Sequence, residues 1–295
     1  MEKFTYKQFE AQFPDDETCL ESIFQNRFGN LKECPSCKKA TTFHKVSDRK
    51  CYSCQWCAYQ IHPLADTIFH KSETSLKSWF YAIFLFSNSK NGVSGKELER
   101  TLGVTYKTAW RMAKQIRLLF IATQSKLSGD VEADETYYGG QEKFKHLADK
   151  TKGTQGRSTK TKTPIFGMVQ RDGVVIAQVV ANTKQSTVTP LIRKNVKIGS
   201  RLMTDEYMAY DLMKKEGYKH LRVNHGAKQY VKGVAHTNTI EGFWSQLKRS
   251  VNGTYHCVSP KYLQFYVNEF AYRYSKRNSE QPLFYPMMKL AGRPV

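Results

Sequence analysis

The sequence contains no apolar segment long enough to cross a bilayer, and it is poor in acidic residues. Its longest apolar run, residues 79–86, falls well short of the roughly 20 residues that a membrane-spanning helix needs. The opening residues lead from Met1 into a mixed polar stretch and not into the apolar core of a signal peptide. These absences argue against membrane insertion and secretion, and they predict a cytoplasmic protein.

The shortage of acidic residues leaves a large positive charge. The chain has 26 Asp and Glu against 46 Lys and Arg, which gives a formal net charge of +20. Such a charge indicates a polyanionic partner, because each phosphate that a basic side chain neutralises releases a counterion. A merely solvated basic surface is the alternative. Hydrophobic residues make up 40% of the 295 residues, so the chain can bury cores in two or three domains.

Cysteine is scarce outside one short segment near the N-terminus, which holds five of the seven cysteines. In a reducing compartment such a cluster binds metal more often than it forms disulfides. Two C-x-x-C pairs, Cys34 with Cys37 and Cys54 with Cys57, have the spacing of two facing knuckles. Four thiolates on two such turns complete a tetrahedral Zn site. We therefore predict a zinc ribbon over residues 15–70 with one structural Zn ion.

Cys51 leaves the ligand assignment open, because Cys51 and Cys54 also form a C-x-x-C sequence. We prefer Cys54 and Cys57 as the second pair, since residues 58–61 then supply the strand that follows a ribbon knuckle. Nearby histidines could also bind metal, but four cysteines already fill the site. These histidines are predicted to be surface or packing residues: His44, His62 and His70.

Residues 71–125 have the pattern of a helix-turn-helix. An apolar helix is expected over residues 76–86. Ser94 and Glu97 occupy the capping-box positions of a second, short helix, and Gly103 stands where that helix should end.

Thr105 is placed to cap a third helix that runs to about Phe120. Its apolar stripe consists of Ala109, Met112, Ala113, Ile116 and Leu119. Its outer face is basic and carries the candidate DNA-binding residues Tyr106, Lys107, Arg111 and Lys114, together with Arg117. A short helix, a turn with glycine and a basic second helix are the parts of a major-groove reader. An ordinary helical hairpin with a solvated basic face remains the alternative.

Residues 128–277 alternate between strand-like and helix-like segments. The expected strands cover 131–138, 165–170, 174–180, 201–204 and 220–223, and the expected helices cover 187–195, 209–216 and 261–274. Arg171-Asp172-Gly173 signals a hairpin turn. A polar, basic loop is expected over residues 141–163, with a charge that suits a DNA backbone. This order of elements resembles a ribonuclease H-like core, an α/β fold.

Acidic residues stand at three notable places in this region. Asp134 lies inside an apolar strand, Asp205 follows a strand, and Glu241 lies on an aromatic-rich helix that begins near Thr237. Two Mg²⁺ ions about 3.5–4 Å apart need bridging and flanking carboxylates to act on a phosphodiester. We therefore predict that these acids hold two catalytic ions, Mg²⁺ or Mn²⁺.

The helix of Glu241 has one polar face, formed by Asn238, Glu241, Ser245 and Lys248. That face can present a carboxylate to metal, with an amide beside it. Lys248 and the neighbouring Arg249 can then bind a DNA phosphate. The opposite, buried side is predicted to consist of Ile240, Phe243, Trp244 and Leu247.

The chain resembles the bacterial insertion-sequence DDE transposases that carry an N-terminal zinc ribbon, a group related to the eukaryotic Merlin transposons. The resemblance covers roughly residues 15–277. Besides the knuckles and the Asp134 strand, the matching segments are 66–69, 103–112, 204–207, 230–231, 236–249, 253–256 and 269–273. Cys51 departs from the four-cysteine ribbon of that group.

This resemblance implies a ribonuclease H-like catalytic domain in which Asp134, Asp205 and Glu241 hold the catalytic metals and Asn238 accompanies the last of them. It implies an enzyme that binds double-stranded DNA at terminal inverted repeats, cleaves the element ends and joins the 3′-hydroxyl to target DNA. A homo-oligomer on DNA and a bacterial, nucleoid-associated location are also implied. Residues 278–295 are expected to be a C-terminal tail.

Two other functions fit part of the pattern. A transcription regulator could combine a ribbon with a helix-turn-helix, but it would have no use for the three acids. A structure-selective nuclease on the same fold would cleave without joining, whereas a helix-turn-helix favours site-specific binding of ends.

Overall fold

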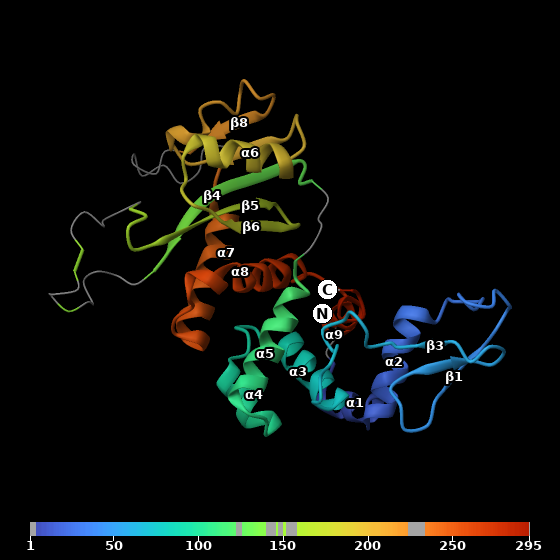
Figure 1. Ribbon diagram of the computed structural model, residues 1–295. Helices are drawn as coiled ribbons and strands as arrows, with labels where there is room; N and C mark the ends of the chain where they lie inside the picture. Colours follow the sequence, from blue (N-terminus) through green and yellow to red (C-terminus); the bar gives the residue numbers. More distant parts are fainter. Residues whose placement is uncertain are drawn as a thin grey trace. The chain divides into compact units, whose positions relative to one another are not determined.

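The computed structural model describes residues 4–121, 126–139, 146, 150–151, 158–223 and 234–294. The chain divides into two compact units, one of residues 1–119 with 278–295 and one of residues 120–277 (Figure 1). Most of the predicted basic loop over residues 141–163 lies outside the described residues, as does the matching segment 230–231. None of the helices within the described ranges is both long and apolar enough to cross a membrane.

The first unit begins with two helices that the sequence pattern did not reveal, α1 (Tyr6–Gln12) and α2 (Asp16–Phe28). Thr5 and Asp15 cap them by accepting hydrogen bonds from backbone N–H groups in the first turn. A small antiparallel sheet follows, made of β1 (Phe43–Lys45), β2 (Tyr52–Cys54) and β3 (Gln60–Ile61). This sheet presents the cysteine knuckles.

Three helices complete the predicted helix-turn-helix region: α3 (Leu76–Asn88), α4 (Gly95–Leu102) and α5 (Tyr106–Leu118). Ser94 caps α4, and Gly103 ends it with a left-handed φ of 64°, a conformation that glycine adopts without a steric penalty. Thr105 caps α5 as predicted. The predicted apolar stripe of α5 is buried.

Arg117 corrects the prediction for the outer face of α5. Its side chain is buried, donates to the backbone O of Val93 at 3.1 Å, and lies over the ring of Phe86. The carbonyl and the aromatic face compensate the buried guanidinium. Arg117 therefore stabilises the helix packing and does not belong to the exposed basic face.

The residues after 277 contain a packed helix, α9 (Phe284–Ala291), although they were expected to form a tail. Phe284 is fully buried and stacks against Phe4, and it also contacts Phe9 and Phe13. The apolar spacing of α9 at i, i+3, i+4 and i+7 is that of an amphipathic helix. The buried face of α9 thus belongs to the core of the first unit.

The second unit contains a five-stranded sheet in the order β6 (Val175–Val179), β5 (Thr163–Gln170), β4 (Asp130–Tyr138), β7 (Arg201–Thr204) and β8 (Lys219–Arg222). The first three strands form an antiparallel meander, and β7 and β8 run parallel to β4. This order and these directions are those of the ribonuclease H-like fold, which confirms the prediction.

Helices cover both faces of this sheet (Figure 1). On one face, α6 (Gln185–Asn195) packs against Val131 and Ala133 of β4. On the other, α7 (Asn238–Ser250) and α8 (Pro260–Ser275) pack against β5 and β6. Since side chains alternate along a strand, Glu132 and Asp134 point toward the face that carries α7.

One predicted helix is wrong. Residues 209–216 form only a 3₁₀ turn, η3 (Met208–Tyr210), followed by further turns. Ala209, Tyr210 and Met213 are all buried, and the Tyr210 hydroxyl donates to Glu135 at 2.8 Å. The burial of these side chains and the hydrogen bond to Glu135 override the local preference for an α-helix. At its C-terminal end, α7 continues into a π-helical turn, η4 (Val251–Tyr255).

Candidate functional site

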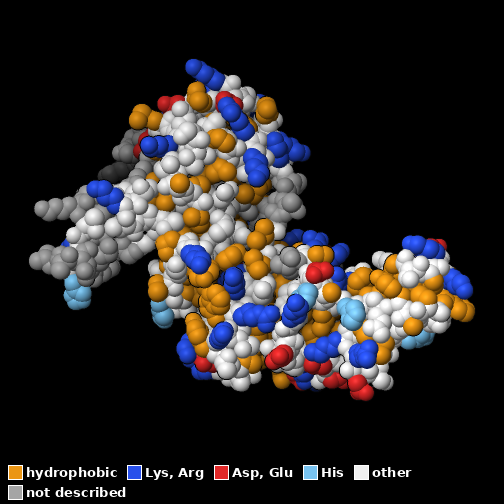
Figure 2. Space-filling model, in the orientation of Figure 1, with side chains coloured by type: hydrophobic (Ala, Val, Ile, Leu, Met, Phe, Trp, Pro, Cys, Tyr) orange, Lys and Arg blue, Asp and Glu red, His pale blue; other side chains and the backbone are white. Residues whose placement is uncertain are grey.

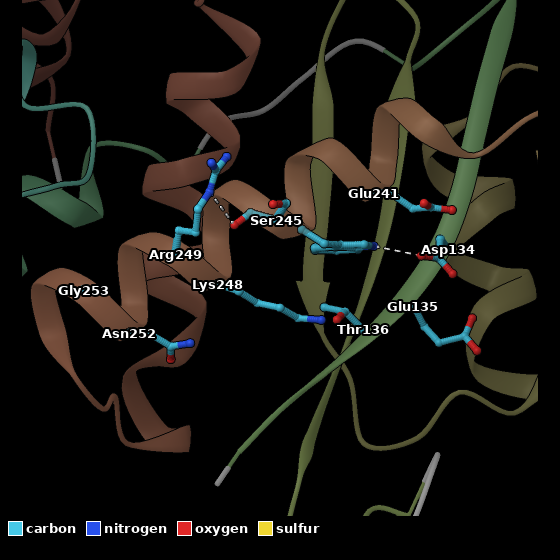
Figure 3. A pocket seen from close by; sticks show the side chains of 10 residues that line it. Asp134, Glu135, Thr136, Glu241, Ser245, Lys248, Arg249, Asn252 and Gly253 are labelled. Carbon is cyan, nitrogen blue, oxygen red and sulfur yellow. Dashed lines mark hydrogen bonds between the residues drawn. The ribbon is translucent and has the colours of Figure 1, made fainter. Parts of the chain in front are cut away.

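Asp134 occupies the centre of the sheet, directly opposite Gly167 of β5. Its Oδ2 atom accepts a hydrogen bond from the indole Nε1–H of Trp244 at 3.1 Å, marked in Figure 3. Trp244 lies on α7, so its indole has to pass over the face of β5 to reach this carboxylate. A Cβ on Gly167 would lie 2.6 Å from the Trp244 ring, so only glycine leaves space for that contact.

The electrostatic environment of Asp134 is unfavourable for an isolated negative charge. Burial raises the pKa of Asp134 to about 7, with contributions from the negative charges of Glu135 and Asp205. A cation bound nearby would remove this penalty by compensating the clustered charges. The donor set, carboxylate oxygen, is the one that hard divalent ions such as Mg²⁺ prefer.

Asp205 follows β7, the parallel neighbour of β4. It is half-buried, and its Oδ1 accepts a hydrogen bond from the backbone N–H of Tyr207 at 3.0 Å. Its influence on the pKa of Asp134 places the two carboxylates in one electrostatic environment. Glu135 points to the opposite face, where it accepts the hydrogen bond from Tyr210.

Glu241 lies in the first turn of α7 and accepts a hydrogen bond from the Thr237 hydroxyl at 2.8 Å. Its side chain is exposed in a cavity of about 790 Å³. In Figure 3 it extends toward Asp134, while Lys248 extends toward Thr136. The residues lining this cavity are Asp134, Glu135, Thr136, Glu241, Trp244, Ser245, Lys248, Arg249, Asn252 and Gly253.

The structure therefore brings Asp134, Glu241, Lys248 and Arg249 to one cavity. Asp205 is linked to it through its charge on Asp134 and is not part of the described lining. Asn238 is the exposed first residue of α7 and also lies outside that lining. Within the described ranges, the three acids do not converge as tightly as the four cysteines do.

Sequence reasoning missed two residues of this region. Trp244 was predicted only as a packing residue, although its place three residues after Glu241 puts both side chains near the same strand. Glu132 was not singled out, although strand alternation puts it on the same face as Asp134. The signal available in the sequence was an acidic residue inside the strand-like segment, two positions before a candidate ligand.

The zinc knuckles meet in the first unit. The Sγ atoms of Cys34, Cys37, Cys54 and Cys57 all lie within 4.8 Å of one another. Burial raises the pKa of the Cys54 thiol, but hydrogen bonds from the Thr41 hydroxyl and from backbone N–H groups outweigh it and bring the pKa down to about 6. A thiolate is the form that binds Zn²⁺.

Cys51 lies outside this cluster. Its buried side chain contacts Gln60, with 3.8 Å between Sγ and Oε1. The preferred pair, Cys54 and Cys57, is the one that the structure brings to Cys34 and Cys37. Of the nearby histidines, His44 is exposed, and His70 accepts a hydrogen bond from the backbone N–H of Asp66 at 2.9 Å.

This arrangement predicts different zinc contents for two cysteine variants. We expect about one Zn per chain in the parent protein, loss of that ion in Cys54→Ser, and retention in Cys51→Ser. The reason is that Cys54 belongs to the four-cysteine cluster and Cys51 does not. Metal analysis of the purified proteins measures this directly. Full zinc retention in Cys54→Ser with loss in Cys51→Ser would reverse the assignment.

The candidate DNA-binding face of α5 is exposed at Tyr106, Lys107 and Arg111. Lys114 is half-buried over the ring of Trp110. Lys96 of α4 lies over the Tyr106 ring, 4.7 Å from its centroid, so the two helices present one basic surface. On the face drawn in Figure 2, Lys and Arg side chains are spread widely and acidic ones are fewer.

Comparison with known proteins gives two family matches. Residues 126–275 match the ISXO2-like transposase domain, and residues 14–60 match the transposase zinc-ribbon domain. An uncharacterized protein in transposable element ISH50 of Halobacterium salinarum is 27% identical over 249 residues, covering 80% of this chain and 83% of that protein. An uncharacterized transposase-like protein of Haemophilus influenzae is 29% identical over 106 residues, covering 36% of this chain and 83% of that protein.

Solved structures with a detectable likeness include the catalytic core domain of BIV integrase. It is 15% identical, with a TM-score of 0.30 and coverage of 52% of this chain and 86% of that chain. The Mos1 strand transfer complex is 9% identical, with a TM-score of 0.23 and coverage of 73% and 78%.

Proposed function

The chain belongs to the ISXO2-like transposase domain family and is a DNA transposase; from this premise we propose that Asp134, Asp205 and Glu241 hold two divalent ions, Mg²⁺ or Mn²⁺. The observation that supports this most directly is the setting of Asp134. Its carboxylate faces Glu241 in one cavity, and burial raises its pKa, with a contribution from the charge of Asp205. A transcription regulator would not need this cluster of carboxylates.

The proposed reaction has two in-line displacements. When bound, the two ions activate the attacking oxygen and stabilise the leaving oxygen. In the first step, water attacks the phosphodiester at the element end, one P–O bond forms as another breaks, and a 3′-hydroxyl is released. In the second, that hydroxyl attacks a phosphodiester of the target: a new P–O bond joins the element to the target, the P–O3′ bond of the target breaks, and a target 3′-hydroxyl leaves. Neither step needs a covalent bond between DNA and protein.

The chain's own residues orient the DNA for these steps. Lys248 and Arg249 line the cavity about two helical turns beyond Glu241, where they can bind a phosphate next to the reacting one. Trp244 fixes Asp134 through its indole N–H. Asn238 begins α7 and is proposed as an accessory residue beside Glu241.

A strand-transfer assay tests this function. The protein is incubated with element-end DNA and a plasmid target, and both nicks and joined products are scored. We expect both products with Mg²⁺ or Mn²⁺, and few with Ca²⁺, whose looser coordination misplaces the reacting oxygens. Nicks without joined products would instead support the structure-selective nuclease.

Recognition of the terminal inverted repeats is assigned to the zinc ribbon and the helix-turn-helix. Binding of two ends at once would require a homo-oligomer, and action on bacterial chromosomal DNA would place the protein in the cytoplasm at the nucleoid. The exposed face of α5 with Tyr106, Lys107, Arg111 and Lys114 would enter the major groove.

Replacing Lys107 and Arg111 by Ala is expected to weaken binding to the inverted repeat more than binding to random DNA. If each side chain reaches a base edge, the loss is about 1–3 kcal/mol per good contact, roughly 5- to 150-fold in affinity. Titration of both DNAs at one fixed salt concentration measures it.

The matched control is the double variant Lys7→Ala and Lys289→Ala. It removes the same charge from exposed positions of α1 and α9 in the same unit. This double variant should weaken binding to the inverted repeat and to random DNA slightly and equally. If the Lys107 and Arg111 variant instead loses the same affinity for both DNAs, these residues contact phosphates and not base edges.

A further inference from the structure

Glu132 is a fully buried carboxylate that the proposed reaction does not use. It lies on β4 two residues before Asp134, so both side chains point to the face that carries α7. A buried charge is costly unless it is paired and hydrogen-bonded. The partners of Glu132 therefore indicate what it does.

The carboxylate of Glu132 binds the N-terminus of α7. Its Oε2 atom accepts hydrogen bonds from the backbone N–H groups of Thr239 at 2.8 Å and Ile240 at 3.0 Å. Its Oε1 atom accepts from the Thr239 hydroxyl at 2.9 Å. The N-cap residue Thr237 makes no side-chain capping bond, so a strand residue supplies the cap of this helix.

Arg171 completes the arrangement from the turn after β5. Its Nε–H donates to Glu132 Oε1 at 2.7 Å. Its two terminal nitrogens donate to the backbone O of Val234 at 2.9 Å and of His236 at 3.1 Å. Arg171 thus balances the buried charge and also holds the segment that leads into α7. His236 lies close as well, with 3.2 Å between its Nδ1 and Glu132 Oε1.

We propose that Glu132, supported by Arg171, is a positioning residue that sets the spacing between the carboxylates of Asp134 and Glu241. This inference rests on the proposed role of those two acids. Helix α7 is attached to β4 at two points: Thr239 and Ile240 bind Glu132, and Trp244 binds Asp134. Glu241 lies between these attachments, directly after Ile240. A displacement of the helix start therefore moves Glu241 relative to Asp134.

The chemistry requires a carboxylate at position 132. Every group that is hydrogen-bonded to it donates, and a glutamine would turn an N–H₂ group toward one of these donors. An aspartate would keep the charge but would be shorter by one methylene. Because Mg²⁺ demands near-ideal octahedral geometry, a small shift of Glu241 should first weaken the use of Mg²⁺.

The test measures end cleavage by full-length Glu132→Gln as a function of Mg²⁺ concentration, well below the melting temperature. We expect the Mg²⁺ concentration for half-maximal cleavage to rise at least tenfold, with zinc content and end binding unchanged. The matched control is Glu269→Gln, which removes an equally buried carboxylate paired with Arg273 on α8. It should lower the melting temperature and leave the Mg²⁺ dependence as in the parent.

Two milder variants, both at Thr239, test the same inference if Glu132→Gln fails to fold. Thr239→Val removes one hydrogen bond to Glu132, and Thr239→Ser keeps it. The valine variant should need more Mg²⁺, and the serine variant should match the parent. Identical Mg²⁺ dependence in both would overturn the inference, as would equal behaviour of Glu132→Gln and Glu269→Gln.

These outcomes are distinct from a failure of the proposed function. Asp134→Asn and Glu241→Gln are assayed in parallel at saturating Mg²⁺. If either remains active, the proposed metal site is wrong. If both are inactive while the Glu132 and Thr239 variants keep the parent Mg²⁺ dependence, only the positioning role is wrong.

Discussion

Asp134→Asn, Asp205→Asn and Glu241→Gln are each expected to abolish strand cleavage and joining. An amide is a poorer ligand than a carboxylate for a hard divalent ion. Loss of one ion removes either activation of the attacking oxygen or stabilisation of the leaving oxygen. We expect the rate of each step to fall by at least about a thousandfold, which corresponds to roughly 4 kcal/mol of activation free energy.

The measurement is the rate of end nicking and of joining, with end binding followed separately. Binding should stay largely intact, because recognition is assigned to the other unit. Asn238→Ala serves as a neighbouring control and should be milder, since Asn238 lies at the start of α7 outside the described cavity lining. Near-normal joining by any carboxylate variant would remove that residue from the metal site.

Gly167→Ala is expected to damage both stability and activity. The new methyl group would lie 2.6 Å from the Trp244 ring and 3.1 Å from Ile240 Cδ1, in the packed layer between β5 and α7. Overpacking of this kind costs about 1–3 kcal/mol of unfolding free energy. The indole must also move, so Asp134 loses the hydrogen bond from Trp244, and we expect cleavage to slow at least tenfold. Chemical denaturation and the cleavage assay measure the two effects.

Gly242→Ala is the matched control, because it adds the same methyl group to α7. There the nearest contact of the new Cβ is the Tyr274 hydroxyl, at 3.9 Å. The helix should be unchanged or slightly more stable, since alanine favours helix over glycine. If Gly167→Ala cleaves as fast as Gly242→Ala, the contact between Trp244 and Asp134 has no part in the reaction.

Local patterns account for much of what the sequence could predict. The strand of Asp134, the hairpin at Asp172 and the caps at Ser94 and Thr105 all depend on residues within one turn or one strand. The same holds for the burial of Ile240, Phe243, Trp244 and Leu247 on α7, which follows from a helical period. For this reason the order of strands and helices that indicated a ribonuclease H-like core could be anticipated, whereas the packing of the residues after 277 against the first unit could not.

The parts that could not be predicted depend on contacts between distant residues. Arg117 has the spacing of an outer-face residue, yet a carbonyl and an aromatic ring bury it. Residues 209–216 have a helical composition, yet the contact of Tyr210 with Glu135 holds a tight turn. The cap of α7 comes from Glu132, more than one hundred residues earlier, and no local capping signal records it.

Helix α9 has a consequence for how the protein matures on the ribosome. Phe284 completes an aromatic core with Phe4, Phe9 and Phe13, so the first unit needs residues that are translated after the whole second unit. Domains usually fold as units while synthesis proceeds. Here the amino-terminal unit stays incomplete until residues 284–291 have left the exit tunnel. Nascent or prematurely terminated chains therefore lack a finished first unit, even when every carboxylate of the second unit has already been made.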